Sequence, residues 1–392
     1  MSDPLRLAFF TGNRAEFGLI WPIVRGLAED RAFSCRLFAG GMHLVESRGN
    51  TVAEVCAAGA EADIPVIRVG APPEFIDAHG VVEWTAAFMP ALSEALAECD
   101  PAAVFVYGDR IETFAAATAA FLRGWVTVHL GGGHITSGGL WDDSLRHAIT
   151  KLAHVHFVSC EKDAEHVLGL HEEPWRIHVI GSPAVERHLG GQVADMAELS
   201  AAVSAGRPQR LGGEFLLFAF HPDTTDAGLA GQRARLCLDA LAKTGRDVLL
   251  TGPNGDLGSD AILAAIHDSI GSHPQFFFRQ HLGARLYLGA VAACAAVVGN
   301  SSSGLLETPL FRKPAVDIGL RQRDRIAAAN VVHVPFDLDK IVDAIHYVRT
   351  DPAFARRLAA MENPFDHGRP SRNIARVLPG LLRRGDIKTK RG

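Results

Sequence analysis

Short, uninterrupted apolar runs alternate with segments of helical periodicity along the whole chain. Six runs in the first half predict strands, at Leu5–Thr11, Ser34–Ala39, Ala103–Tyr107, Val126–Leu130, His156–Ser159 and Ile177–Ile180. Six more follow a polar stretch near residues 201–213, at Phe215–Phe220, Asp247–Thr251, Phe276–Arg279, Ala295–Val298, Ala315–Ile318 and Val331–Val334. Runs that are apolar at every position are typical of parallel strands that helices cover on both faces.

The two series predict an α/β protein with two Rossmann-like domains. Strands that alternate with helix-length segments indicate βαβ units, and 392 residues exceed what one hydrophobic core usually organises. In open parallel sheets, ligands bind beyond the carboxyl ends of the strands. Polar, glycine-containing loops occupy such positions repeatedly, among them TGNRAEFG, GDRIE, HPDTT and GNSSSGLLE. They predict a ligand-binding cleft between the domains.

Composition narrows the class of protein. The chain is 48% apolar with a formal net charge of −5, which disfavours nucleic acid or an anionic membrane as its partner. Its six cysteines include no CxxC pair, a pattern that favours reduced, buried thiols in a cytoplasmic protein. We expect no signal peptide and no membrane-spanning segment. The basic segment RRGDIKTKRG is expected to be solvated and frayed.

The stretch VVGNSSSGLLETP predicts an anion site. A strand ends at Gly299, and a helix then begins whose free N–H groups favour phosphate. The residues that begin this helix are Ser301, Ser302, Ser303 and Gly304. An ordinary serine N-cap would explain only one of the three serines. Glu307, one turn further on, is either a ribose contact or a solvated helix residue.

Other loops supply further candidate ligands for a nucleotide. These are Arg14 after the first strand, His221 in HPDTT, Asn254 in TGPNGD, and Arg321 and Arg325 in GLRQRDR. A guanidinium can bind two phosphate oxygens at once, although surface cations are common and a lone histidine is usually structural. The chain has no GxxxxGK[ST] loop and no GxGxxG after its first strand. These absences disfavour a P-loop nucleotidase and a nicotinamide cofactor.

Two loops of the first half supply candidate catalytic carboxylates. Asp109 and Glu112 lie in GDRIE, and Asp143 lies in WDDSLRH. Asp143 precedes Arg146 by three residues, so pairing along a helix, or N-capping of it, explains an aspartate there as well as catalysis does. Three histidines follow, His147, His154 and His156. Their spacing matches no usual ligand pattern, and we predict no metal.

Several motifs together resemble the UDP-N-acetylglucosamine 2-epimerase family, and most closely its hydrolysing branch, which feeds sialic and legionaminic acid pathways. They are TGNRAEFGLIWPIV, GDRIETFAAATAA, DDSLRHAITKLAHVHF, EEPWRIHVIGSP, FHPDTT, GPNGD, GNSSSGLLETP and NPFDHGRPSRNIARVL. The resemblance implies a GT-B-like pair of domains, residues 1–185 and 186–365. It also implies a C-terminal helix within 366–392 that crosses back to the first domain, a homodimer or tetramer, and no cofactor.

The resemblance implies a reaction as well. A nucleoside diphosphate leaves a UDP- or GDP-linked 2-acetamido sugar through a 2-acetamidoglycal. Water then gives the free 2-epimer, N-acetylmannosamine or a 2,4-diacetamido-6-deoxy analogue. Carried over by position, the catalytic carboxylates are Asp109 and Asp143, with Glu112 beside them, and Arg146 and His147 line the sugar subsite. The implied diphosphate contacts are Arg14, His221, Ser302, Ser303 and Arg321, and the ribose contact is Glu307.

One motif departs from the family pattern. The usual His-x-Glu-Gly-Gly-Asp/Glu is replaced by His129-Leu130-Gly131-Gly132-Gly133-His134. Gly131 stands at the position of the expected catalytic glutamate and cannot transfer a proton. Loss of one acid–base group typically lowers a rate by ~10²–10⁴-fold. His134 is a candidate substitute because imidazoles titrate near neutral pH. Ser137 occupies a later position that is often acidic.

Other functions stay open at this point. A GT-B-like glycosyltransferase would move the sugar to an acceptor rather than to water. A non-hydrolysing epimerase would keep the nucleotide attached, although its usual central motif differs from DDSLRHAITKL. A non-catalytic nucleotide-sugar binder would retain the phosphate site alone. The sequence selects neither the base nor the substituents at sugar C4 and C6.

Overall fold

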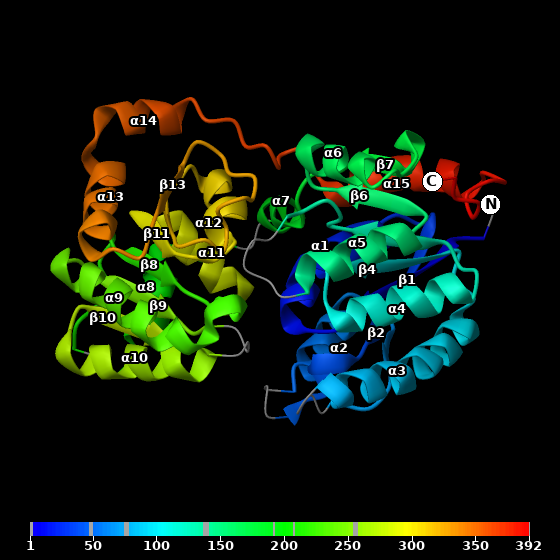
Figure 1. Ribbon diagram of the computed structural model, residues 1–392, viewed down its shortest axis with the longest axis horizontal. Helices are drawn as coiled ribbons and strands as arrows, with labels where there is room; N and C mark the ends of the chain where they lie inside the picture. The colour runs from blue at the N-terminus through cyan, green and yellow to red at the C-terminus, as the bar shows by residue number, and fades with distance from the viewer. Residues whose placement is uncertain are drawn as a thin grey trace. The chain divides into compact units, whose positions relative to one another are not determined.

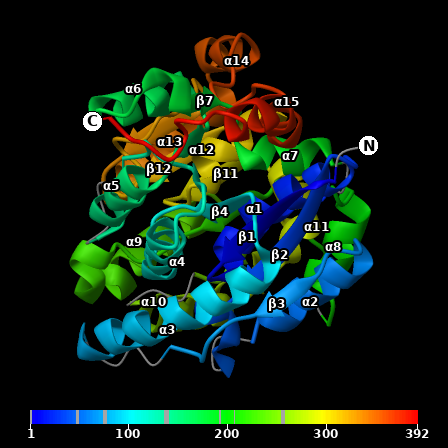
Figure 2. The ribbon, with the colours of Figure 1, turned by 90° about the vertical axis from the view of Figure 1, so that its right-hand side faces the viewer.

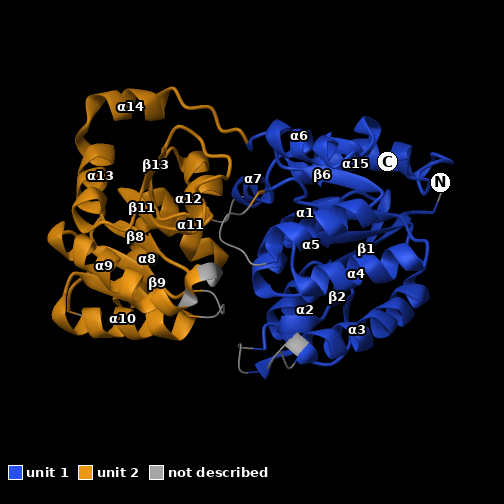
Figure 3. Ribbon diagram, in the orientation of Figure 1, with its two compact units in different colours: residues 1–134, 141–190, 365–392 blue, residues 135–140, 191–364 orange. Residues whose placement is uncertain are grey.

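The chain folds into two compact units. The structure, a computed structural model, describes residues 3–46, 50–73, 78–135, 141–190, 193–206, 208–253 and 258–391. Unit 1 comprises residues 1–134, 141–190 and 365–392, and unit 2 comprises residues 135–140 and 191–364 (Figure 3). Each unit is a parallel β-sheet with helices packed on it (Figure 1). Among the described residues, no helix is both long and apolar enough to cross a membrane.

The described part of unit 1 has a seven-stranded parallel sheet in the order β3-β2-β1-β4-β5-β6-β7. Its strands are β1 (Leu5–Thr11), β2 (Phe33–Ala39), β3 (Val66–Arg68), β4 (Ala103–Tyr107), β5 (Thr127–Leu130), β6 (Val155–Val158) and β7 (Ile177–Val179). The strand order reverses between β1 and β4. Loops that follow strands on either side of such a point are the usual place for a ligand.

Helices cover both faces of this sheet because successive strand residues point to opposite sides. Phe9 packs in one buried cluster and Phe10 in another. The helices are α1 (Arg14–Ala28), α2 (Val52–Glu61), α3 (Ala78–Cys99), α4 (Ile111–Leu122), α5 (Asp142–Leu152), α6 (Glu161–Gly169), α7 (Pro183–Leu189) and α15 (Pro370–Leu382), with 3-10 turns η1 (Gly41–Leu44) and η3 (Pro174–Arg176). Helices α3 and α4 pack together (Figure 2), and α15 packs on α1 and α7.

Unit 2 has six described parallel strands in the order β10-β9-β8-β11-β12-β13. They are β8 (Leu216–Ala219), β9 (Val248–Thr251), β10 (Phe276–Arg279), β11 (Ala296–Gly299), β12 (Ala315–Ile318) and β13 (Val331–Val334). Its helices are α8 (Met196–Ser204), η4 (Thr224–Leu229), α9 (Ala230–Lys243), α10 (Ser259–Ser272), α11 (Gly283–Ala293), α12 (Ser303–Leu306), η5 (Thr308–Phe311), α13 (Leu338–Thr350) and α14 (Pro352–Ala359). Here the strand order reverses between β8 and β11.

The predicted strands are all present, and their ends agree within about one residue. Strand β3 was not predicted, because its three residues are only partly buried and give no apolar run. The expectation of a frayed basic tail is wrong. Ile387 is buried, and the buried Arg176 donates hydrogen bonds to the carbonyl oxygens of Ile387 (2.7 Å) and Thr389 (2.6 Å). Buried charged groups of unit 1 find their partners in this segment.

Candidate functional site

A buried arginine joins two carboxylates at the carboxyl end of the unit 1 sheet. Asp109 follows β4, Asp143 lies in the first turn of α5, and Arg146 follows one turn later. The Arg146 guanidinium forms ion pairs with both carboxylates. Its side chain is 2% exposed, whereas those of Asp109 and Asp143 are 27% and 32% exposed. The Arg146 guanidinium is therefore the buried part of this cluster, whereas both carboxylates are partly exposed to solvent.

Charge compensation explains why the arginine tolerates burial. Desolvation alone would lower the pKa of Arg146, but the Asp109 and Asp143 carboxylates raise it above its ordinary value. A buried cation left without such partners would be strongly unfavourable. One cation and two carboxylates leave the cluster with a net negative charge.

His134 is attached to the same cluster and pairs with a buried acid. Arg146 donates a hydrogen bond to the His134 carbonyl oxygen at 2.6 Å. The His134 imidazole Nε2 lies 3.1 Å from Asp163 Oδ2 on α6, and Asp163 is 1% exposed. A carboxylate that lies beside one ring nitrogen orients the imidazole. This geometry equips His134 as an acid–base group, a role that stays a prediction.

The glycine loop between β5 and His134 has backbone dihedral angles that favour glycine. Gly131 has φ +77° and Gly133 has φ +85°, in the left-handed region that disfavours residues with a Cβ. A Cβ on Gly133 would lie 2.2 Å from the Asp163 carbonyl oxygen. Gly133 thus allows the loop to approach α6 closely enough for the His134–Asp163 pair. A glutamate at position 131 would have to adopt the same strained backbone.

Glu112 lies behind this cluster and is 0% exposed. The Arg110 Nε lies 3.6 Å from Glu112 Oε2. Glu16 on α1 is also buried; it accepts hydrogen bonds from the Gly12 amide and the Thr113 hydroxyl, both at 2.9 Å. Burial raises the pKa of Glu16 to about 8, and the Glu112 charge acts in the same direction. The two acids form a buried pair, and a catalytic role of Glu112 stays a prediction.

A buried histidine connects the loop that carries Asp109 to helix α5, which carries Arg146. His129 Nε2 donates to the Gly108 carbonyl oxygen at 2.8 Å, and its Nδ1 lies 3.1 Å from the Thr150 hydroxyl. That hydroxyl also lies 3.0 Å from the Arg146 carbonyl oxygen. Burial lowers the pKa of His129 to about 3, so the ring is neutral. His129 therefore positions the cluster without carrying charge.

The serine loop of unit 2 differs from the predicted helix N-terminus. Helix α12 has only four residues and continues as the 3-10 turn η5. A helix this short has little macrodipole, because the dipole sums over aligned peptide units. An anion at this loop would therefore be bound by hydroxyls and backbone amides rather than by a helix dipole, and the anion site stays a prediction. Ser303, Gly304 and Glu307 are buried, and Ser301 and Ser302 are partly exposed.

Asn300 ties the serine loop to the loop after β8. Its Oδ1 accepts from the His221 amide (2.8 Å), and its Nδ2 donates to the His221 carbonyl oxygen (2.9 Å). The Asn300 carbonyl oxygen accepts from Arg321 (3.2 Å) and from Gln322 (3.1 Å). Asn300 is 1% exposed. The Asn300 side chain thus holds the loop after β8, and its backbone carbonyl holds the loop that carries Arg321.

Electrostatics in this region give His221 a defined state. Desolvation lowers its pKa to about 3, and the Arg321 positive charge acts in the same direction. His221 is therefore neutral at pH 7 in the free protein. Arg325 donates to Gln322 at 3.0 Å. Desolvation and the Glu307 charge raise the pKa of Tyr287, which keeps its hydroxyl protonated.

The remaining predicted residues lie elsewhere or outside the described residues. Arg14 begins α1 in unit 1, where its Nε lies 3.2 Å from Glu54 Oε2. His147 is partly buried on α5. Asn254 and Ser137 fall outside the described residues. Within the described ranges, no group of three histidine, cysteine or acidic side chains could hold a metal ion.

A family model described as UDP-N-acetylglucosamine 2-epimerase matches residues 25–379. The chain belongs to the UDP-N-acetylglucosamine 2-epimerase family. It is 29% identical over 345 residues to UDP-N-acetylglucosamine 2-epimerase from Neisseria meningitidis serogroup B, with 87% of this chain and 86% of that protein covered. It is 28% identical over 345 residues to GDP/UDP-N,N'-diacetylbacillosamine 2-epimerase (hydrolyzing) from Campylobacter jejuni, with 87% of each covered.

A solved structure of this epimerase family shares the fold. The crystal structure of UDP-GlcNAc 2-epimerase from Neisseria meningitidis bound to UDP-GlcNAc has a TM-score of 0.78 and 16% sequence identity, over 96% of this chain and 100% of that chain. The two parallel-sheet domains are thus those of GT-B-like epimerases, as predicted.

Sequence reasoning missed four polar residues of the candidate site. They are Glu16, His129, Asp163 and Asn300. Three of them lie within the motifs quoted above, namely Glu16, His129 and Asn300. A side chain whose role is to hold another side chain or loop in place leaves no periodic pattern in the sequence. Asp163 lies on α6, remote in sequence from the glycine loop. Only the packing of α6 against that loop brings it to His134.

Proposed function

We propose that the protein is a hydrolysing 2-epimerase of a UDP- or GDP-linked 2-acetamido sugar. It would release the nucleoside diphosphate and the free 2-epimer, either N-acetylmannosamine or a 2,4-diacetamido-6-deoxy analogue. Family membership supports epimerisation at C2, and the Campylobacter jejuni relative, a hydrolysing enzyme by its name, supports the use of water.

The chemistry requires one step that breaks two bonds. The C2 proton is not acidic, because C1 is an acetal carbon. It can leave when the C1–O bond breaks with it, which forms a 2-acetamidoglycal and expels the nucleoside diphosphate. Water then adds its hydroxyl to C1, and a proton returns to C2 on the opposite face. The protein must remove one proton, deliver another, and stabilise a departing diphosphate.

One observation carries the proposal. Arg146 holds Asp109 and Asp143 together and also binds the carbonyl of His134, whose ring pairs with Asp163. Two carboxylates and the backbone of His134 thus contact a single buried cation. We assign proton transfer at C2 to these groups, with His134 supplying the acid–base capacity that Gly131 lacks.

In unit 2, we assign the diphosphate and ribose contacts to the loops that Asn300 joins. The proposed diphosphate ligands are His221, Ser301, Ser302, Ser303, Gly304, Arg321 and Arg325, and Glu307 is the proposed ribose ligand. Neutral His221 can donate a hydrogen bond to phosphate, and Arg321 supplies the positive charge. Arg14 of unit 1 is a further proposed phosphate contact.

The test is turnover in heavy water followed by NMR. UDP- and GDP-linked N-acetylglucosamine and its 4-acetamido-6-deoxy analogue are supplied separately. We expect nucleoside diphosphate and a free 2-epimer that carries one deuterium at C2. Release of the diphosphate without deuterium at C2 would refute epimerisation. A 2-epimer that is still nucleotide-linked would identify a non-hydrolysing enzyme, and product formed only with an added acceptor would identify a glycosyltransferase.

Variants of the His134–Asp163 pair test its assignment. His134→Gln should lower kcat by ~10²–10⁴-fold, and Asp163→Asn should lower it less, with UDP affinity unchanged in both. His79→Gln is the control, because that histidine is exposed on α3 and 77% accessible. Full activity of His134→Gln would remove His134 from the proton transfers while leaving the reaction itself in place.

A further inference from the structure

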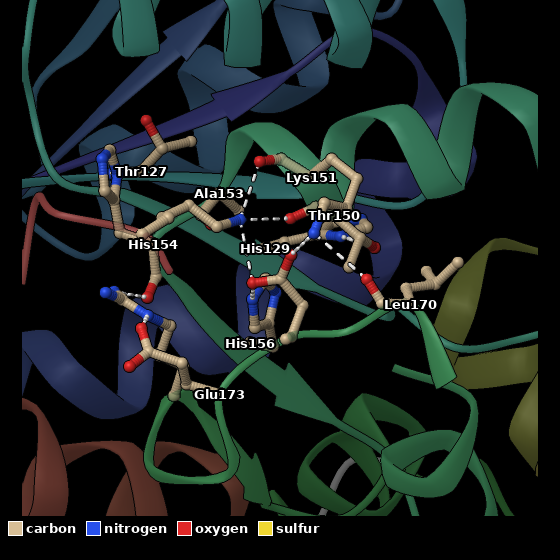
Figure 4. Close-up of polar contacts among 12 residues, drawn as sticks. Thr127, His129, Thr150, Lys151, Ala153, His154, His156, Leu170 and Glu173 are labelled. Atoms are coloured by element: carbon tan, nitrogen blue, oxygen red, sulfur yellow. Dashed lines mark hydrogen bonds and ion pairs between the residues drawn. The ribbon is translucent and has the colours of Figure 1, made fainter. Parts of the chain in front are cut away.

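The carboxyl end of α5 is capped by a lysine that lies more than 230 residues further along the chain. Lys390 Nζ donates to the carbonyl oxygens of Thr150 (3.1 Å), Lys151 (2.7 Å) and Ala153 (2.7 Å). In Figure 4, dashed lines run from one nitrogen to oxygen atoms beside Thr150 and Lys151. The last carbonyl groups of a helix have no partner within the helix and carry partial negative charge. A cation with three N–H donors is well matched to them.

A buried carboxylate holds this lysine from the other side. Glu172 is 1% exposed; its Oε2 lies 2.9 Å from Lys390 Nζ and 3.0 Å from His156 Nε2, and its Oε1 lies 2.8 Å from Lys151 Nζ. Although burial alone would raise the pKa of Glu172, hydrogen bonds from His156, Lys151 and Lys390 lower it to about 2. Glu172 is therefore ionised at neutral pH.

The backbone before Lys390 is held as firmly. The buried guanidinium of Arg176 donates to the carbonyl oxygens of Ile387 and Thr389, and also to that of His154 at 3.0 Å. The Ile387 side chain is buried in the core cluster that includes α1 and α15. These contacts leave Lys390 little freedom to choose another partner.

Helix α5 transmits this anchorage to the catalytic cluster. Its eleven residues span about 16 Å, with Asp143 and Arg146 near one end and the Lys390 contacts at the other. Thr150, whose carbonyl binds Lys390, also contacts the Arg146 carbonyl and His129 through its hydroxyl. His129 in turn holds Gly108, which precedes Asp109. Both carboxylates of the cluster therefore depend on how α5 is seated.

We propose that Lys390 is a positioning residue for catalysis, which seats α5 so that Arg146 holds Asp109 and Asp143 in their working geometry. This inference rests on the proposed function, because it assumes that those carboxylates move protons. Lys390 touches neither substrate nor the carboxylates, and it acts only through the helix.

The electrostatic surroundings of Lys390 decide the pH of the test. Burial lowers its pKa to about 8, with Lys151 and Arg176 acting in the same direction and Glu172 against them. The other titratable or charged groups around it are His154, His156 and Lys388. At pH 7 the ammonium is charged and can donate all three hydrogen bonds, so the measurements belong there.

The experiment compares Lys390→Met, Lys390→Arg and Lys388→Met in the full chain. Lys388 is an exposed neighbour in the same segment and is the matched control. Lys390→Met should lower kcat by about 10–100-fold, the size expected when reacting groups are misplaced by about 1 Å, with KM and UDP affinity unchanged. Lys390→Arg should recover most of kcat, and Lys388→Met should match the parent. Loss of UDP affinity together with kcat would indicate a general structural role and overturn the proposal.

Hydrogen exchange separates this inference from the proposed function. In Lys390→Met, the backbone amides of 146–153 should exchange at least tenfold faster than in Lys388→Met, whether or not any sugar is turned over. Unchanged exchange and unchanged kcat would overturn the positioning role while leaving epimerisation intact. A parent protein without turnover, but with faster α5 exchange in Lys390→Met, would refute the proposed function and keep the anchorage of α5.

Discussion

The role of Asp143 could not be decided from the sequence alone. Three roles were open to it: helix N-cap, partner of Arg146, or catalytic acid. The structure excludes the first, because α5 is preceded by Trp141 at the N-cap position. The second is correct, since Asp143 pairs with Arg146. The second role does not exclude the third, because the same guanidinium also binds Asp109, which lies 37 residues away. That convergence depends on β4 and β5 being neighbours, which no local pattern reveals.

The Glu16–Glu112 pair gives a prediction for stability as a function of pH. Burial raises the pKa of Glu16 from 4.5 to about 8, so the folded state holds a proton that the unfolded chain releases. The stabilisation is complete below about pH 4.5 and is lost as the pH rises through about 8. Glu16→Gln removes the titrating group but keeps an oxygen for the Gly12 amide. At pH 8.5, urea unfolding should show this variant to be more stable than the parent by ~1–3 kcal/mol.

The same two proteins should have nearly equal stability at pH 5. Glu29→Gln, an exposed substitution at the end of α1, is the control and should follow the parent at every pH. Stability curves of Glu16→Gln and the parent that run parallel from pH 5 to 8.5 would show that Glu16 is ionised in the folded protein.

At the scale of elements, hydrogen bonds of Asn300 hold the serine loop in place. The sequence predicted a helix N-terminus, but α12 is a single short turn, and its loop is held by Asn300. Asn300→Ala would leave the buried His221 amide and carbonyl groups unpaired, at about 1–3 kcal/mol for each unsatisfied group. For the two groups together we expect the free energy of unfolding to fall by about 2–6 kcal/mol. UDP affinity, measured by calorimetry, should fall about tenfold because the His221 loop separates from the serine loop, whereas the Asn300 carbonyl that binds Arg321 is kept.

A second buried hydrogen bond in unit 2 provides the control for this variant. Ser204 accepts from the Leu211 amide at 3.0 Å on α8, away from the β11 loop. Ser204→Ala should also destabilise the protein and yet bind UDP as the parent does. Equal loss of UDP affinity in both variants would mean that Asn300 acts through general stability alone.

Across the whole molecule, the sequence was most informative where one strand gave one uninterrupted apolar run. All the predicted strands were recovered, because parallel strands buried on both faces leave a signal that needs no partner. The short, half-exposed β3 left none. The site was predicted as a set of loops, yet its supporting contacts were not. Asp163 and Lys390 contact residues that are remote in sequence. The basic segment RRGDIKTKRG was predicted to be solvated, whereas its Lys390 binds Glu172 and the carboxyl end of α5.

The distribution of ligands and of tryptophans between the two units allows a final prediction. All five tryptophans lie in unit 1, at Trp21, Trp84, Trp125, Trp141 and Trp175, whereas every proposed diphosphate ligand except Arg14 lies in unit 2. A ligand at 100 times its Kd stabilises the folded state that binds it by about 2.7 kcal/mol. UDP without a sugar should therefore stabilise unit 2.

Circular dichroism reports both units, and tryptophan fluorescence reports unit 1. UDP should raise the circular-dichroism midpoint more than the fluorescence midpoint. Equal shifts would show that the units unfold as one cooperative system, and the absence of any shift would contradict a nucleotide site in the serine loop. Arg321→Met should abolish the UDP-dependent shift and leave the fluorescence transition in place, which connects the global measurement to one side chain.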